Sequence, residues 1–416
     1  MSALAWIALV SLAAWLWLLL GQGLFWRTDL RLPPRRDPED WPYVCIVVPA
    51  RDEAAVLRES LPSLLAQDYP GRAEIVFVDD GSSDGTGRLA RALADRHRGL
   101  PLTVTSPGEP PAGWTGKLWA VRHGIACARA AGDRKPGPRA RATAREYHHD
   151  ATAQTPEYLL LTDADIAHEP DNLRELVAAA RSGGYDLVSQ MARLRVVSAW
   201  EQLVVPAFVY FFAQLYPFRW VAEDGGRTAA AAGGCVLLRT DAAERAGVPE
   251  AIRHAVIDDV ALAGAVKRSG GRIWLGLAER VDSIRPYPHL ADLWQMVSRS
   301  AYAQLRHSPA LLLGTVLGIA VVYLAPPVAL AAGLLLGDPV AAAAGGAAWL
   351  IMTATYLPML RYYSRTLWLA PLLPVTALLY LFMTVDSAIQ HYRGKGAAWK
   401  GRTYKRPDRA EAAPDQ

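Results

Sequence analysis

The sequence predicts an α/β fold, in which a mostly parallel central sheet is flanked by helices, with transmembrane helices at the N-terminal and C-terminal ends. Three observations predict this class. From about residue 42 to residue 300, short β-branched runs alternate with stretches of helical periodicity, a pattern typical of βαβ units. Within this region, two acidic clusters directly follow apolar runs of strand length, residues 75–77 and 158–161. Long apolar segments lie at both ends of the chain.

The first apolar segment, residues 3–26, carries no charge and is long enough to cross a hydrocarbon core of about 30 Å. We expect residues 1–26 to be a retained membrane anchor rather than a cleaved signal peptide, because the start lacks a basic region and no small-residue cleavage site precedes the first arginine. A basic linker, residues 27–41, follows and contains Arg27, Arg31, Arg35 and Arg36. By the positive-inside rule, these arginines predict that the central region lies in the cytoplasm.

The central region, residues 42–308, is expected to form one α/β domain. Its expected elements are, in order, strand 43–48 ending at Pro49, helix 53–67, strand 75–78, helix 86–98, a weaker strand 102–104, strand 158–161 and helix 260–268. Residues 133–157 break the pattern and predict a flexible insert. The insert contains His148 and His149, but no other ligands accompany them, so a polar insert is favoured over a metal site.

Residues 200–220 form a strongly aromatic segment, in which Glu201 and Arg219 are the charged residues. Tyr and Trp side chains favour the head-group level of a bilayer, so the segment is a candidate interfacial helix. A buried core helix would have the same composition, and periodicity does not separate the two interpretations. Both stay open.

A second apolar block, residues 309–388, is expected to be a multi-helix membrane region, followed by a basic cytoplasmic tail, residues 389–416. Two polar breaks divide the block into three candidate segments, at residues 337–339 and 361–365. Three crossings would put the basic tail outside, against the positive-inside rule. We therefore expect the segment around Pro371 and Pro374 to be re-entrant, because its prolines interrupt a helix.

The composition indicates a membrane partner rather than a nucleic acid. The net charge is +4, and the basic residues gather beside the apolar segments, where anionic lipid head groups are a sufficient partner. The three cysteines, Cys45, Cys127 and Cys235, lack the paired spacing of a metal site and are expected to be reduced, buried thiols.

Three pairs of carboxylates are the candidate functional groups: Asp79 with Asp80, Asp163 with Asp165, and Asp258 with Asp259. Side chains at the carboxyl ends of strands face the crevice where open α/β sheets bind ligands. If residues 163–165 are extended, both carboxylates leave one face and can share a hard divalent cation. The adjacent carboxylates at 258 and 259 repel, so one of them would have a raised pKa and suit a general base. Tight turns and helix capping are the alternative explanations.

Five motifs occur in the order seen in family 2 glycosyltransferases of the GT-A fold: VPARDE (48–53), VDDGSSDGT (78–86), GKLWA (116–120), TDAD (162–165) and IDD (257–259). The resemblance covers about residues 42–300. The N-terminal anchor, the C-terminal membrane block and the ending WKGRTY (399–404) look most like the hopene-associated glycosyltransferases, relatives of ceramide glucosyltransferase.

This resemblance implies a role for each candidate residue. The nucleotide sugar would contact Ala50, Arg51, Glu53, Asp79, Asp80, Lys117 and Asp163. Asp163 and Asp165 would hold Mg²⁺ or Mn²⁺, which neutralises the charge of the leaving diphosphate. Asp258 and Asp259 are the catalytic candidates, and Asp259 would deprotonate the acceptor hydroxyl as it attacks the anomeric carbon with inversion. The small residues Gly233–Cys235 would let the backbone approach the donor or the acceptor.

One motif departs from the family pattern. Relatives usually carry Gln-x-x-Arg-Trp after the base, whereas this chain reads QMVSRS at residues 295–300. Arg299 takes the arginine position only when Met296 replaces Gln and Ser300 replaces Trp. The resemblance implies that Arg299 clamps the diphosphate, since a guanidinium suits phosphate oxygens. A helix-surface arginine beside the membrane is the alternative.

The sequence therefore predicts a metal-dependent inverting glycosyltransferase that passes a sugar from a nucleotide-diphospho-sugar, expected to be a UDP-sugar, to a membrane lipid. The resemblance implies a hopanoid acceptor. The expected location is the bacterial inner membrane, crossed several times, with the catalytic domain in the cytoplasm. Two alternatives stay open. A processive polysaccharide synthase would need a membrane channel, and a non-catalytic nucleotide-sugar-binding membrane protein would not need the base.

Overall fold

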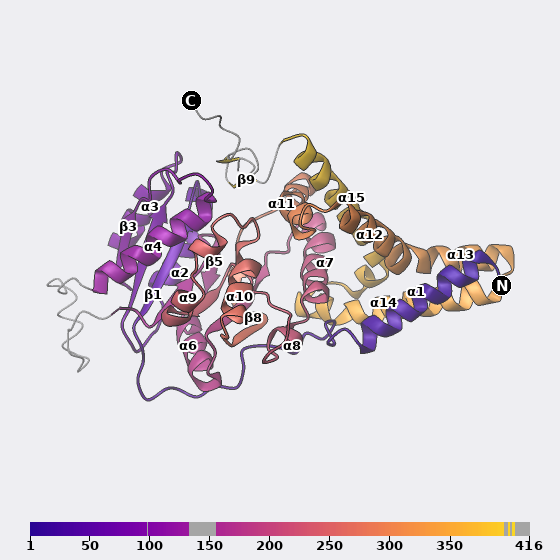
Figure 1. Cartoon of the computed structure of the whole chain (residues 1–416), viewed down its shortest axis with the longest axis horizontal. Helices are drawn as coiled ribbons and strands as arrows, with labels where there is room; N and C mark the ends of the chain where they lie inside the picture. The colour runs from indigo at the N-terminus through magenta and orange to yellow at the C-terminus, as the bar shows by residue number, and fades with distance from the viewer. Residues whose placement is uncertain (98, 133–154, 395–397, 400–401, 404–416) are drawn as a thin grey trace, which may run out of the picture. The chain divides into compact units, whose positions relative to one another are not determined.

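The structure, a computed structural model, describes residues 1–97, 99–132, 155–394, 398–399 and 402–403 (Figure 1). These residues form two compact units. Unit 1 comprises Met1–Leu30, Leu194–Thr228 and Pro286–Gln416, and unit 2 comprises Arg31–Arg193 and Ala229–Arg285. Most of the expected insert, residues 133–154, lies outside the described residues.

Unit 2 is built on a sheet that, in the described residues, has eight strands in the order β3-β2-β1-β4-β7-β6-β8-β5. The strands are β1 (Val44–Ala50), β2 (Ala73–Asp79), β3 (Leu102–Thr105), β4 (Tyr158–Leu161), β5 (Ile166–His168), β6 (Leu187–Leu194), β7 (Val236–Arg239) and β8 (Ile273–Ser283). Strands β1 to β4 pair in parallel, as predicted, whereas β7 is antiparallel to β4 and β6, and β5 is antiparallel to β8. The predicted α/β class is confirmed, with a mixed sheet.

Strand β1 extends further than expected, because Pro49 does not end it. Pro49 lies opposite Val78 of β2, and the strand runs on to Ala50. On its other side, β1 pairs with β4 only as far as Val47 opposite Leu161. The missing N–H of Pro49 therefore falls beyond the end of β4, where no ladder bond is lost.

Helices pack on both faces of the sheet. They are α2 (Ala54–Leu65), α3 (Thr86–Arg96), α4 (Gly116–Gly132), α6 (Asn172–Gly183), α9 (Thr240–Arg245) and α10 (Asp258–Arg268). Leu57 and Leu61 of α2 pack with Phe77 on one face, and Val121 of α4 packs with Val47 on the other. The expected helices at 53–67 and 86–98 are confirmed with shorter ends, and the one at 260–268 is confirmed with a start two residues earlier, at Asp258. Because side chains alternate along a strand, β1 serves both cores.

The carboxyl ends of the parallel strands meet at one edge of the sheet. The backbone N–H of Asp80 donates to the carbonyl of Ala50 (2.9 Å), and that of Thr162 donates to the carbonyl of Val47 (3.2 Å). The residues after β1, β2 and β4 therefore start from neighbouring points on this edge.

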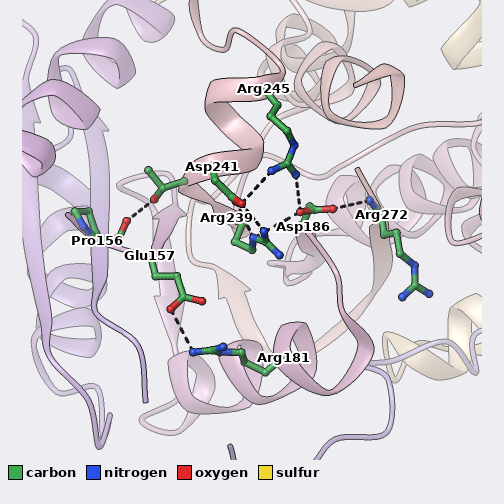
Figure 2. Close-up of polar contacts among 9 residues, drawn as sticks. Pro156, Glu157, Arg181, Asp186, Arg239, Asp241, Arg245 and Arg272 are labelled. Carbon is green, nitrogen blue, oxygen red and sulfur yellow. Dashed lines mark hydrogen bonds and ion pairs between the residues drawn. The ribbon is translucent and has the colours of Figure 1, made fainter. Parts of the chain in front are cut away.

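The opposite edge of the sheet is held by charged side chains (Figure 2). The buried carboxylate of Asp186 pairs with Arg245 (Oδ1 to Nη2, 3.1 Å) and accepts a hydrogen bond from the backbone N–H of Arg272 (2.9 Å). Arg239, at the end of β7, donates through Nε to Asp241 (2.7 Å). These contacts tie the start of β6 to the end of β7 and the start of β8, and so stabilise the antiparallel half of the sheet.

Unit 1 is helical. Its helices are α1 (Ala3–Leu20), α7 (Ala199–Leu215), α8 (Phe218–Val221), α11 (Leu290–Gln304), α12 (Pro309–Ile319), α13 (Ala325–Leu336), α14 (Pro339–Tyr362) and α15 (Leu373–Tyr392). A π-helical turn, Ala320–Leu324, joins α12 to α13, and a 3₁₀ turn, Leu367–Leu372, precedes α15. In the described part of the chain, four helical segments are long and apolar enough to cross a membrane: Ala3–Leu20, Pro309–Leu336, Pro339–Tyr362 and Leu367–Tyr392. Two short strands, β9 (Ala398–Trp399) and β10 (Arg402–Thr403), pair antiparallel.

The aromatic segment forms α7, whose central face is buried within unit 1. The Tyr210 side chain is fully buried, contacts the rings of Phe25 and Tyr356, and shares a hydrogen bond with Thr355 of α14 (2.8 Å). This face matches the buried-helix interpretation. Trp200, at the first turn, remains 41% exposed. An interfacial position for that end of α7 stays a prediction.

Contacts within unit 1 define which ends of the apolar helices lie together. Ser2, before α1, donates to Asp338 at the turn between α13 and α14, and α1 lies beside α13 and α14 (Figure 1). At the other end of α14, Thr28 donates to the carbonyl of Pro358 (3.5 Å). Helix α15 instead packs on α11, where Ser387 accepts from the backbone N–H of Tyr302 (3.0 Å). The last turns of α15 therefore lie beside the residues that precede α12.

Candidate active site

A cluster of charged side chains forms at the edge where the parallel strands end. Lys117, in the first turn of α4, places its Nζ 2.9 Å from Oδ1 of Asp163 and 3.1 Å from Oδ2 of Asp258. Asp163 follows β4, and Asp258 begins α10. Three segments distant in the sequence thus meet at one ammonium group. Burial opposes the charged form of Lys117, but the two carboxylates outweigh it and raise the pKa of Lys117 above its usual range.

Asp259 is the second carboxylate of α10, and its two oxygens are held separately. Oδ2 accepts the backbone N–H of Gly233 (2.9 Å), and Oδ1 accepts that of Val260 (2.8 Å). Burial and the neighbouring charge of Asp258 raise the pKa of Asp259 to about 6. A carboxylate with such a pKa is mostly ionised at neutral pH and remains basic enough to accept a proton. The Val260 contact satisfies one of the free N–H groups in the first turn of α10, but the Gly233 contact has no such role in the helix.

Asp163 and Asp165 lie at the turn that joins β4 to β5. The backbone N–H of Ile166 donates to the carbonyl of Asp163 (3.3 Å). Residues 163–165 are therefore not extended, as a shared face for the two carboxylates would require. The two carboxylates have different partners. Asp163 pairs with Lys117, whereas Asp165 accepts a hydrogen bond from Nε of Arg285 (Oδ2, 2.6 Å).

The carboxylates fit a hard cation. Burial and the charges of Asp165 and Asp258 raise the pKa of Asp163, although Lys117 opposes the shift, so added positive charge would stabilise the ionised form. Within the described residues, no group of three or more His, Cys, Asp and Glu side chains is placed to hold a metal. A cation at Asp163 or Asp165 would therefore complete its coordination with water or with ligand oxygens, as Mg²⁺ commonly does.

The residues after β1 and β2 form the adjoining part of the edge. Arg51 donates through Nη1 to the carbonyl of Asp80 (2.5 Å), and its guanidinium lies 3.7 Å from the buried Asp80 carboxylate. Asp79 accepts the backbone N–H of Ser82 (3.0 Å), so the predicted tight turn is present. A Cβ added at Gly87 would lie 2.3 Å from Oδ2 of Asp79. A side chain at position 87 would therefore push the Asp79 carboxylate out of its present position.

A pocket opens beside these groups. Lys117, Asp163, Asp258 and Asp259 line its polar part, and the apolar part includes side chains from α4 and α10: Leu118, Val121, Ile125 and Leu262. Ala50 is buried at the end of β1. Arg299, by contrast, has an exposed side chain on α11, in unit 1.

Two functional candidates were missed by the sequence analysis. Arg285 bridges Asp165 and Glu53 (Nη2 to Oε2, 2.5 Å), although it is far from both in the sequence. Buried His168 shares a hydrogen bond with Thr162 (Nε2 to Oγ1, 2.9 Å), next to Asp163. The sequence feature that could have indicated a role for Arg285 is its position just after a long strand. For His168, the only such feature is its position just after the acidic motif.

Comparison with known proteins gives the following matches. The family model described as "Glycosyltransferase like family 2" matches residues 42–303. "Probable glycosyltransferase YdaM" of Bacillus subtilis is 33% identical over 93 residues, which are 22% of this chain and 21% of that protein. "Beta-monoglucosyldiacylglycerol synthase" of Synechocystis is 29% identical over 124 residues, 25% of each chain. This chain thus spans a quarter or less of these relatives.

Among solved structures, the chain is similar to that titled "Mannosyltransferase PcManGT from Pyrobaculum calidifontis in complex with GDP-Man and Mn2+". The TM-score is 0.48 and the sequence identity is 21%, with 96% of this chain and 100% of that chain covered.

Proposed function

Because the chain belongs to glycosyltransferase family 2, whose model covers residues 42–303, we propose that it transfers a sugar from a nucleotide-diphospho-sugar to the hydroxyl group of a membrane lipid. The observation that carries this proposal is the cluster at the sheet edge, where Lys117 pairs with Asp163 and Asp258 beside the hydrogen-bonded carboxylate of Asp259. It combines a cation for the leaving group with a base of raised pKa.

Asp259 acts as the base. Its carboxylate accepts the proton of the acceptor hydroxyl while the hydroxyl oxygen forms a bond to the anomeric carbon. The bond from that carbon to the diphosphate oxygen breaks, and the nucleoside diphosphate leaves with the electron pair. Attack from the side opposite the diphosphate inverts the anomeric configuration. The backbone N–H of Gly233 holds Asp259 in place for this step, and the charge of Lys117 favours the leaving group.

A divalent cation, Mg²⁺ or Mn²⁺, would be held by Asp163 and Asp165 and, when bound, neutralises negative charge on the diphosphate. The raised pKa of Asp163 supports this, because burial and the neighbouring carboxylates of Asp165 and Asp258 both disfavour its negative charge. The nucleoside would lie along Ala50, Arg51, Glu53, Asp79 and Asp80, where β1 and β2 end.

A lipid acceptor is supported by the four apolar segments of unit 1, since a soluble acceptor would not require them. One matched relative bears a name that describes synthesis of a glycosylated diacylglycerol. A hopanoid acceptor rests on the sequence resemblance to the hopene-associated glycosyltransferases. The proposed location is the bacterial cytoplasmic membrane, with residues 42–308 as the cytoplasmic catalytic domain.

We further propose that segment 367–392 is re-entrant and does not cross the membrane. The 3₁₀ turn at its start lies beside the middle of α14, because Trp349 donates through Nε1 to the carbonyl of Pro371 (3.1 Å). Its last turns lie beside α11, just before α12 begins, because Trp294 donates to Asp386 (2.8 Å). The basic tail then stays on the side of the basic linker, as the positive-inside rule requires. A C-terminal tag should be cleaved by protease in inverted membrane vesicles, and cleavage in intact spheroplasts would contradict this topology.

The function is tested with membranes that carry the wild-type chain, Asp165→Asn or Asp259→Asn, each supplied with a panel of nucleotide sugars. We expect the wild type to consume one of them and both variants to lose at least about a hundredfold in rate. Equal turnover by all three would contradict the catalytic assignment.

A further inference from the structure

Arg285 occupies the place where the nucleoside side and the metal side of the candidate site meet. Its Nη2 lies 2.5 Å from Oε2 of Glu53, at the start of α2, and its Nε lies 2.6 Å from Oδ2 of Asp165. All three side chains are at most 24% exposed. One guanidinium thus joins a carboxylate from the β1 edge to a carboxylate of the β4–β5 turn.

The backbone fixes this arginine at the site. The antiparallel pairing of β5 with β8 sets Ile166 opposite Ser283, and the backbone N–H of Ile284 donates to the carbonyl of Asp165 (3.0 Å). Arg285 follows directly. The backbone pairing of β5 with β8 therefore positions both the acidic turn and the backbone of Arg285.

Carboxylates predominate around Arg285: Glu53, Asp163, Asp165, Asp258 and Asp259. In the described residues, Lys117 pairs with Asp163 and Asp258, and Arg285 pairs with Glu53 and Asp165. A diphosphate that links a nucleoside at β1 to a sugar near Asp259 must pass this point. It would be repelled unless cations turn toward it.

We propose that Arg285 is a diphosphate-binding residue that pairs with Glu53 and Asp165 and turns to the diphosphate when a divalent cation binds Asp165. This inference rests on the proposed function and deepens it. The guanidinium competes with the cation for one carboxylate oxygen, and it can instead donate two parallel hydrogen bonds to phosphate oxygens. Arg285 would thereby supply the arginine that the sequence analysis had assigned to Arg299.

The proposal predicts opposite effects on two ligands. Without the guanidinium, the cation no longer competes at Asp165, so Arg285→Ala should bind Mn²⁺ alone about tenfold more tightly. The same variant should bind UDP in the presence of saturating Mn²⁺ about tenfold more weakly or worse, because a charge-assisted contact is lost. Arg285→Lys keeps the charge, so it should bind Mn²⁺ as the wild type does and lose part of the UDP affinity.

The experiment uses the full chain in detergent micelles. Mn²⁺ binding is measured by the electron paramagnetic resonance signal of the free ion, and UDP binding by calorimetry. Arg280→Ala is the matched control, because Arg280 lies on β8, the strand that leads to Arg285, and pairs with Asp171 (2.9 Å) rather than with the acidic turn; it should change neither affinity. Thermal unfolding of each variant verifies that it is folded.

The outcomes separate the two proposals. If Arg285→Ala weakens both ligands together, leaves both unchanged or weakens Mn²⁺ alone, the role of Arg285 is overturned while the function stands. A larger loss of UDP affinity in Arg299→Ala than in Arg285→Ala would also overturn it. If the wild type binds neither Mn²⁺ nor UDP and turns over no nucleotide sugar, the proposed function fails first, and the inference fails with it.

Discussion

The rate of sugar transfer should depend on pH through a single carboxyl group, Asp259. Burial and the charge of Asp258 raise its pKa from 3.8 to about 6. Only the ionised form can accept the proton of the acceptor hydroxyl. At pH 7 about nine tenths of the molecules would carry the active form, and at pH 5 about one tenth would. The rate should therefore fall about tenfold per pH unit below pH 6.

The assay follows transfer of a labelled sugar into an organic-soluble product between pH 4.5 and pH 8. Asp259→Asn cannot accept the proton and should lose about 10²-fold to 10⁴-fold in rate at pH 7, with little pH dependence left. Asp241→Asn is the control, because Asp241 lies in the network at the far edge (Figure 2) and should keep the wild-type profile. A wild-type rate that stays constant from pH 7 down to pH 4.5, or an unchanged acid limb in Asp259→Asn, would refute the reasoning.

Three further predictions concern the frame of the site. Desolvation lowers the pKa of buried His168 to about 3, so below pH 6.5 this histidine takes up a proton in the unfolded chain but stays neutral in the folded chain. The free energy of unfolding should therefore fall by up to about 1.4 kcal/mol per pH unit from pH 6.5 toward pH 3. Thermal unfolding measures this fall, which should be shallower in His168→Gln. Asp186→Asn should cost about 2–4 kcal/mol in denaturant unfolding, yet leave the rate per folded molecule unchanged, since it breaks the far-edge network alone. Gly87→Ala should raise the KM of the donor with kcat nearly constant in steady-state kinetics, because its methyl group would displace Asp79; an unchanged KM would remove Asp79 from the donor site.

The sequence predicted the parallel half of the fold and the common end of the sheet from which its strand-end carboxylates project. Apolar runs of strand length before Asp79 and Asp163 were sufficient, because parallel strands end at a common edge. The motif resemblance supplied Lys117, whose contacts with Asp163 and Asp258 are present. Pro49 was misjudged because the effect of a proline depends on which neighbouring strand has already ended.

The remaining features depend on pairings between distant segments. The contact between Arg285 and Asp165 spans 120 positions and requires the antiparallel pairing of β5 with β8, which no local periodicity reveals. The turn at Asp163 matches the tight-turn alternative that the sequence had left open for this acidic pair. Arg299 was assigned from a degenerate motif, and its exposed position on α11 leaves its role a prediction.

The central claim, transfer of a sugar to a membrane lipid by the carboxylate of Asp259, is tested most directly by mass spectrometry of lipid extracts. Cells that produce the wild-type chain are compared with cells that produce Asp259→Asn at the same membrane level. The account predicts a lipid heavier by one sugar residue in the wild type, with its unmodified acceptor accumulating in the variant. Identical lipid profiles from the two strains would contradict it.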